Sequence, residues 1–369
     1  MSDIYSHCGR EPSVGRATYG ERVIAERLAA QGLSGPPAGS PGEVVQRLLA
    51  VQAQDGRGAR LSIRSRSTGL TAADVDHALT ERRSLVVTWL NRGTLHLVES
   101  DDYWWLHPLT TPKLAAGNAR RLRQEGVSPA QAALGVEVVT AASSEGPQTR
   151  PQLRARLEAA GVPTKGQALV HVLVAASLRG HVVRGPMCGT EHAYVDAHNW
   201  LGPAPPPLDP DEALGRLAHR YLVGHGPADA RDLAKWAGIT LGQARRGIDA
   251  VGDDLTHSDD GMVDLADRQP APAPPPPRLL GAFDPLLLGW VSREPVVGDR
   301  RRLVTTNGLF RPFALVGGRA VATWGLDAGT LTIRPLEPIA PDSLDELRED
   351  AGAVLRFLHL PETPAEVTP

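Results

Sequence analysis

Two stretches of the chain share one pattern: EGPQTRPQLRARLEAAGVPTKGQALVHVLVAASLRGHVVRG at 145–185 and HGPADARDLAKWAGITLGQARRGIDAVGDDLTHSDDGMVDL at 225–265. Each starts with a Gly-Pro pair, and the two glycines, Gly146 and Gly226, lie 80 residues apart. In each stretch an amphipathic helix ending in Ala-Gly precedes a turn containing Thr, a second amphipathic helix and a short hairpin. This order is typical of a helix-turn-helix followed by a β wing, and it predicts two copies of that unit.

The N-terminal part of the chain predicts a third copy. Apolar residues at helical spacing predict a helix over 18–33 and another over 43–55. Ser40-Pro41 provides the N-cap and first turn of the second helix, and Asp55-Gly56 is expected to stop it.

A further helix and a hairpin complete this copy. Thr71 is the expected N-cap of the helix in TAADVDHALTERR. Apolar and polar residues then alternate over 84–100 on both sides of Asn91-Arg92-Gly93, which predicts two strands joined by a short turn. Three helices followed by a hairpin form the winged-helix pattern.

The C-terminal part differs in character. Pro-rich runs at 202–212 and 268–278 are expected to act as stiff, extended spacers. Residues 279–335 are predicted to be strand-rich, with a tight hairpin turn at Gly317-Gly318. Apolar residues over 342–358 predict a closing helix.

We therefore expect a mainly α protein with small β elements, an α+β fold of three tandem winged-helix units and a C-terminal β unit. The expected segments are a mobile tail at 1–17, winged-helix units at 18–130, 131–205 and 206–268, a Pro-rich linker at 269–278, and a C-terminal β unit with its helix at 279–360.

Composition narrows the class of protein. The 369 residues are 41% hydrophobic and 22% charged, which is typical of a globular chain of two to four units. The sequence has no apolar run long enough to span a membrane, and its first residues resemble no secretion signal. With only Cys8 and Cys188, a disulfide scaffold is excluded, and we expect a cytoplasmic protein.

The net charge of −3 hides an uneven distribution. Residues 55–123 hold eleven Lys or Arg against seven acids, 148–184 six against one, and 293–319 six against two. A nucleic acid responds to the local patch and not to the sum, so these stretches permit DNA binding. Solvated helix faces would look the same, so charge alone leaves both interpretations open.

No nucleotide-binding loop, metalloprotease motif or nucleophile elbow occurs in the sequence. His181, His192 and His198 with Cys188 follow no ligand spacing typical of a metal site, and we interpret them as residues around a wing. We therefore expect neither a metal nor a cofactor.

Gln52-Ala53-Gln54 is the most unusual local feature. On a helix, residues i and i+2 point in different directions, so the two amides converge only if the helix ends there or the backbone extends. Asp55-Gly56 directly afterwards allows such an end. Four arginines follow, which are Arg57, Arg60, Arg64 and Arg66. The simpler interpretation is two exposed glutamines at a helix end.

The chain resembles the AlkZ-type family of winged-helix DNA glycosylases, found in producers of DNA-alkylating antibiotics. The resemblance extends over nearly the whole chain after residue 18. It rests on VQAQD (51–55), TWLNRGTLHLV (88–98), GPMCGTEHAYV (185–195), LLGAFDPLLLG (279–289) and GGRAVATW (317–324).

This resemblance implies three winged-helix units around a concave basic surface, with a β-hairpin that enters the DNA cleft. The Gln-x-Gln motif of the family falls on Gln52 and Gln54, whereas a related bacterial branch has Gln-x-Asp there. The hairpin is expected near Arg300, Arg301 and Arg302, after the Gly298-Asp299 turn, with 181–195 as the next candidate.

Two amides suit the chemistry of an N7-alkylated purine. Such a base carries a positive charge and leaves readily, so the enzyme must steady an oxocarbenium-like sugar and place a water molecule. A glutamine carbonyl can do both, but it cannot deprotonate water as Asp can. Bulky or cross-linked adducts fit attack in an open groove better than a pocket for a flipped base.

We therefore expect a monofunctional DNA glycosylase acting on N7-alkylated purines in double-stranded DNA, with interstrand cross-links made by a natural product as a further candidate substrate and no obligate protein partner. The catalytic residues would be Gln52 and Gln54. DNA would be bound by Arg57, Arg60, Arg64, Arg92, Arg300, Arg301 and Arg302. The alternatives are a non-catalytic winged-helix regulator and a protein that sequesters the alkylating drug.

Overall fold

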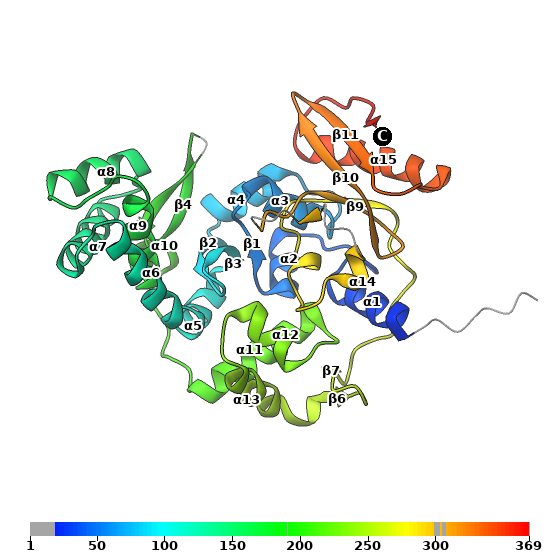
Figure 1. Cartoon of the computed structure of the whole chain (residues 1–369), viewed down its shortest axis with the longest axis horizontal. Helices are drawn as coiled ribbons and strands as arrows, with labels where there is room; N and C mark the ends of the chain where they lie inside the picture. Colours follow the sequence, from blue (N-terminus) through cyan, green and yellow to red (C-terminus); the bar gives the residue numbers. More distant parts are fainter. Residues whose placement is uncertain (1–18, 190, 299–302, 305–307, 369) are drawn as a thin grey trace, which may run out of the picture.

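A computed structural model describes residues 19–189, 191–298, 303–304 and 308–368 (Figure 1). The tail expected at 1–17 and the cleft arginines Arg300, Arg301 and Arg302 lie outside these residues. The α+β fold class is confirmed, because helices dominate among the described residues and their strands form two five-stranded sheets and one two-stranded sheet.

The first helices explain where the glutamine motif sits. Helix α1 spans Tyr19–Ala30, and α2 spans Pro41–Leu48 with Ser40 as its N-cap. The prediction that this helix continues to residue 55 was wrong. It ends at Leu48 because Leu49 adopts a positive φ of 61°, which an α-helix does not allow. The chain then extends into the short strand β1, Val51–Gln52.

Asp55 begins a helix instead of stopping one. Its carboxylate accepts a hydrogen bond from Gly58 N at 2.6 Å and caps α3, Gly56–Arg64, a helix that the sequence pattern did not predict. The helix expected after Thr71 is confirmed as α4, Ala72–Thr80. Thr71 N donates to the carboxylate of Asp74 and closes a capping box.

The predicted hairpin is confirmed as β2, Leu85–Leu90, and β3, Thr94–Glu99. Helices α5, Ser100–Thr110, and α6, Pro112–Gln124, follow it. The next segment contains α7, Pro129–Ser144, α8, Arg150–Ala159, α9, Ala168–Leu178, β4, Val182–Cys188, β5, Glu191–Asp196, and the short α10, Ala197–Leu201. One sheet joins both segments in the order β1-β3-β2-β4-β5.

The third helical segment contains α11, Pro210–His225, α12, Ala230–Ala237, and α13, Leu241–Val251, followed by the strands β6, Leu255–His257, and β7, Val263–Leu265. Helix α12 ends at Gly238 in the left-handed conformation. A Cβ on Gly238 would lie 2.5 Å from the carbonyl oxygen of Asn91, so only glycine lets α12 end against the β2–β3 turn.

The C-terminal segment is less strand-rich than predicted. Strand β8 spans only Arg278–Leu280, and β9, Phe313–Val316, begins much later. The hairpin expected around the Gly298-Asp299 turn requires a strand before it, but Val296 and Val297 lie in helix α14, Glu294–Val297, which has a proline in its first turn. The Gly317-Gly318 turn is confirmed between β9 and β10, Arg319–Asp327. Strands β11, Thr330–Pro335, and β12, Glu366–Val367, and helix α15, Pro341–Phe357, complete this part.

Shared apolar cores hold these segments together. One core joins the β2–β3 hairpin to α11–α13 and to the loops before β9, and another joins α2–α4 to the C-terminal sheet and α15. A buried ion pair between Arg66 and Asp284, at 2.8 Å, fastens the loop after β8 to the end of α3. The division into three winged-helix units stays a prediction.

Candidate active site

Strand β1 gives the two glutamines a common face. Its residues pair with β3, so that Gln52 lies opposite His96, and Ala53 N donates to Leu95 O at 2.7 Å. In an extended backbone, side chains at i and i+2 point to the same side. Gln52 Nε2 accordingly donates to Gln54 Oε1 at 2.8 Å. The amides meet because the backbone extends, which was one of the two conditions set by the sequence.

Arg92, in the β2–β3 turn, fixes the first amide. Its Nη2 donates to Gln52 Oε1 at 3.0 Å, and its Nη1 donates to Trp236 O in α12 at 2.9 Å. Burial, and then the positive charge of Arg293, lower the pKa of Arg92 to about 10. The side chain therefore remains a cation at neutral pH and belongs to the site, although the sequence predicted for it only a role in DNA binding.

His96 is a neighbour that the sequence analysis did not select. It lies opposite Gln52 in the sheet, and its Nδ1 is 3.0 Å from Thr94 O. Burial, and then the positive charge of Arg92, lower its pKa to about 3. The ring is therefore neutral at physiological pH. Its place in TLHLV, among apolar residues of a buried strand, was the available signal.

Gln52 is buried, whereas Gln54 is exposed and lines a groove of about 670 Å³. Asp55, Arg57 and Arg60, which follow Gln54 in the chain, also line this groove. Residues of α8 and of the β4–β5 hairpin line it as well, and they include Arg150, Arg184, Met187, Glu191 and His192. The groove thus leads from the molecular surface to the second amide.

The predicted DNA-binding arginines do not all gather here. Arg57 is exposed in the groove. Arg60 Nε donates to Asp76 Oδ1 at 2.9 Å, and Arg64 Nη1 donates to Asp350 Oδ2 of α15 at 2.8 Å. The side chains of Arg60 and Arg64 are only 15% and 10% exposed, so both are partly neutralised inside the fold.

In the part of the chain that the structure describes, no three His, Cys, Asp or Glu side chains are grouped so that they could hold a metal ion. No helix of the same residues is long and apolar enough to cross a membrane. Cys188 is an exposed free thiol at the end of β4.

The fold belongs to a known class of DNA glycosylase. A family model described as DNA glycosylase AlkZ-like matches residues 45–357, and the chain therefore belongs to the AlkZ-like DNA glycosylase family. The resemblance read from the sequence is confirmed.

One relative is similar over almost its whole length. The protein named interstrand DNA cross-link repair glycosylase, from Streptomyces sahachiroi, is 27% identical over 376 residues, which cover 94% of this chain and 98% of the relative. The solved structure of the Streptomyces sahachiroi DNA glycosylase AlkZ superposes with a TM-score of 0.79 at 25% identity, covering 95% of this chain and 100% of that one.

Proposed function

We propose that the chain is a monofunctional DNA glycosylase that hydrolyses the N-glycosidic bond of N7-alkylated purines, including purines held in interstrand cross-links. The observation that carries this proposal is the hydrogen-bonded pair Gln52–Gln54, which Arg92 fixes at the end of an open groove. Such a reaction, in the cytoplasm, would protect a cell that makes an alkylating natural product.

The amide pair supplies orientation without a strong base. Arg92 donates to Gln52, and this hydrogen bond fixes the orientation of the Gln52 amide. Gln52 in turn donates to Gln54 and fixes the orientation of the Gln54 amide. The second lone pair of the Gln54 carbonyl and its NH₂ group remain available in the groove. We infer that Gln54 holds the attacking water while its dipole steadies the sugar as positive charge develops.

Asp55 is the carboxylate closest in sequence to this pair, and its role is testable. Its Oδ1 accepts from Gly58 N at 2.6 Å, so it is engaged as a helix cap. We infer that it is not the base of the reaction. Asn caps helices as well as Asp does but cannot take a proton. Asp55→Asn is therefore expected to retain excision, within about threefold of wild type.

The test is incubation with duplex DNA that contains N7-methylguanine, followed by heat or alkali to cleave abasic sites. A second substrate carries a bulky N7 adduct, and a third an N7–N7 interstrand cross-link. We expect cleavage at all three and none at uracil, 8-oxoguanine or 1,N6-ethenoadenine, because neutral bases need a stronger acid or base to leave. Binding without turnover of any lesion would support a DNA-binding regulator instead, and drug binding without DNA a sequestering protein.

Borohydride trapping tests the monofunctional mechanism. The sequence has no Lys beside the Gln-x-Gln motif. The fold, however, brings α12 to Arg92, because Arg92 donates to the carbonyl of Trp236, and Lys235 is the residue next to Trp236. We infer that water and not this amine attacks the sugar. Wild-type protein should give no covalent DNA adduct with borohydride, and an adduct that Lys235→Ala abolishes would establish a lyase.

A further inference from the structure

We propose that a cationic band, made of Lys113, Arg120 and Arg121 on α6, Arg92 in the β2–β3 turn, Lys235 on α12 and Arg293 before α14, binds the phosphodiester backbone of duplex DNA. The proposal deepens the proposed function, since it names the surface that would hold the DNA of that reaction. Of this set, the sequence analysis named only Arg92 as a DNA-binding residue, although Lys113, Arg120, Arg121 and Arg293 lie in its basic stretches.

One half of the band lies on a single face of α6. Lys113, Arg120 and Arg121 are spaced by seven and eight residues, which places them on one side of a helix. All three are exposed. They line a hollow of about 660 Å³ together with Trp89, Arg92 and His171, and no Asp or Glu is among the described residues that line it. A basic hollow without an acid favours an anion.

Gly117 lies on the same face of α6, in the middle of the helix. A Cβ on Gly117 would meet no atom within 4 Å, so no packing contact requires a glycine there. Glycine inside a helix lowers its stability relative to alanine, and one use of such a glycine is to let a ligand approach the backbone closely. Gly117 thus keeps the floor of the hollow open between Lys113 and Arg120.

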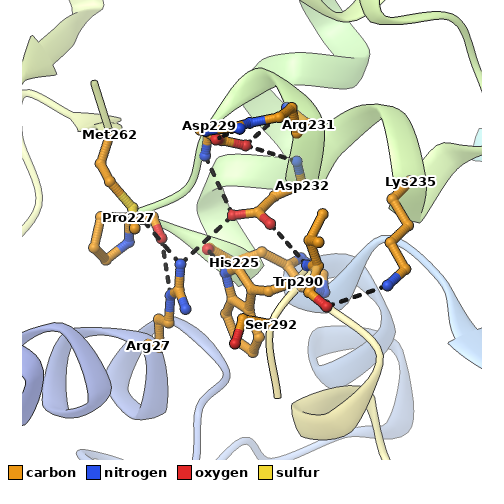
Figure 2. Close-up of polar contacts among 12 residues, drawn as sticks. Arg27, His225, Pro227, Asp229, Arg231, Asp232, Lys235, Met262, Trp290 and Ser292 are labelled. Atoms are coloured by element: carbon orange, nitrogen blue, oxygen red, sulfur yellow. Dashed lines mark hydrogen bonds and ion pairs between the residues drawn. The ribbon is translucent and has the colours of Figure 1, made fainter. Parts of the chain in front are cut away.

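The other half of the band lies across Arg92. Lys235 Nζ donates to Val291 O at 3.2 Å, and Val291 N donates to Asp232 Oδ1 at 2.7 Å, so the segment leading to Arg293 is held against α12 (Figure 2). Arg293 Nε donates to Leu287 O at 2.7 Å. This anchoring brings Lys235 and Arg293 to the α12 side of Arg92.

These cations repel one another in the free protein. The positive charges of Arg293 and Arg92, after the effect of burial, lower the pKa of Lys235. The nearby carboxylate of Asp232 is already engaged, since it accepts from Val291 N and pairs with Arg27 at 3.5 Å (Figure 2). A bound phosphate would relieve this repulsion.

The chemistry of the proposed reaction needs the same phosphates. A cationic base and an oxocarbenium-like sugar would both be repelled by Arg92, which contacts Gln52 at 3.0 Å. Phosphates bound along the band offset that positive charge and bring negative charge to the reacting sugar. Arg60 and Arg64 are less suited to this role, because Asp76 and Asp350 already pair with them.

The test is the salt dependence of binding to an undamaged, fluorescein-labelled duplex, measured by anisotropy with the full chain. One variant combines Lys113→Ala, Arg120→Ala and Arg121→Ala, and another combines Lys235→Ala and Arg293→Ala. The control removes three exposed arginines from other helices, Arg154→Ala, Arg245→Ala and Arg348→Ala, and so matches the charge of the triple variant.

We expect the slope of log affinity against log salt to fall in magnitude by about 0.9 for each lost contact, with roughly 5- to 10-fold weaker binding per contact at 0.1 M salt. The control should keep the wild-type slope. Wild-type slopes in both band variants would overturn the proposal. So would an equal loss in the control, which would show that positive charge spread over the surface, and not the band, holds the DNA.

Gly117→Glu provides a variant that adds a carboxylate where the structure has open space. We expect weaker binding with a thermal melt equal to or above that of wild type, because the variant removes a glycine from a helix. Gly117→Glu binding like wild type would count against the band. Because the duplex carries no lesion, these measurements do not depend on excision. A protein that binds through the band but excises nothing would overturn the proposed function alone, and the reverse result would overturn the band alone.

Discussion

Arg92 uses one planar guanidinium to bind two acceptors that lie 184 residues apart, Gln52 Oε1 and Trp236 O. We predict that Arg92→Lys lowers the excision rate by about 10- to 100-fold, because an ammonium group lacks the fork that spans both acceptors. Single-turnover excision of N7-methylguanine measures this effect. DNA affinity should change less than threefold, since the charge is kept, and an affinity loss equal to the rate loss would make Arg92 only a phosphate ligand.

The glutamines should act on the rate and not on binding. We predict that Gln52→Ala or Gln54→Ala lowers single-turnover excision by about 10- to 1,000-fold, as expected for loss of a preorganised dipole. Gln269→Ala, an exposed glutamine of the Pro-rich linker, is the control. Two single variants with wild-type rates would rule out the catalytic assignment. Gln54→Asp places a base at the same position and is expected to change the pH profile.

The pH profile of excision follows from the two shifted groups beside Gln52. His96, with a pKa of about 3, stays neutral, and Arg92, with a pKa of about 10, stays charged. We predict a flat rate between about pH 6 and 9 and a decline above about pH 10, where Arg92 loses the proton that it donates to Gln52. A bell-shaped profile centred near neutrality would show that an ionisable group carries the reaction.

At the scale of the elements, helix α3, which directly follows the Gln-x-Gln motif, packs closely against the C-terminal segment at Gly58. A Cβ on Gly58 would lie 2.3 Å from the carbonyl oxygen of Ala282. We predict that Gly58→Ala costs about 1–3 kcal/mol of stability, because backbone would have to move. Gly117→Ala is the matched control in a helix with open space, and it should stabilise by about 0.5–1 kcal/mol. Urea unfolding of both variants measures their free energies of unfolding. The prediction is wrong if the unfolding midpoints of Gly58→Ala and Gly117→Ala shift in the same direction by the same amount.

Local signals in the sequence predicted most helices and turns correctly. They gave the wrong helix end where tertiary packing determines the backbone conformation. Ser40, Thr71 and Gly317-Gly318 announce a cap or a turn by their own chemistry, and each occurs as expected. Leu49 carries no such signal. Its positive φ is unfavourable for a branched side chain and persists because Leu49 is completely buried in the core. The end of α2, and with it the strand that aligns the glutamines, depends on tertiary packing.

At the scale of the whole molecule, the candidate site depends on contacts that no local pattern contains. The sequence predicted Gln52 and Gln54 through a family resemblance, and it found Arg92 only as one arginine among many. Trp236, Lys235 and Arg293 come from segments far along the chain. Their approach to Arg92 follows from the packing of α12 against the hairpin turn, which no motif encodes.

Buried histidines should make the stability of the whole chain depend on pH. Burial lowers the pKa of His225 from 6.5 to about 3, and the ring packs between Tyr221, Trp236 and Trp290. Between about pH 6.5 and pH 3, His225 is therefore protonated in the unfolded chain but neutral in the folded chain. Stability is therefore full above pH 6.5 and falls by about 1.4 kcal/mol per pH unit for this residue as the pH drops towards 3.

His225→Phe tests this dependence. We predict that the variant loses about 1.4 kcal/mol per pH unit from the slope of unfolding free energy between pH 6 and 4, measured by urea titration. Phenylalanine keeps the aromatic packing but takes up no proton. An unchanged slope would mean that His225 is already protonated in the folded chain.

The two hydrogen bonds of Arg92 join a side chain of the first sheet to the backbone of α12, and this makes two equilibria reciprocal. If the packing of α12 against the hairpin stabilises the orientation of Gln52, then the correct orientation of Gln52 stabilises the packing of α12 by the same free energy. A bound duplex that moves α12 away from the first sheet would weaken the hydrogen bond that orients Gln52. A duplex that presses α12 against the sheet would strengthen it. In the proposed function, the orientation of Gln52 would thus depend on how the bound duplex positions α12 against the first sheet.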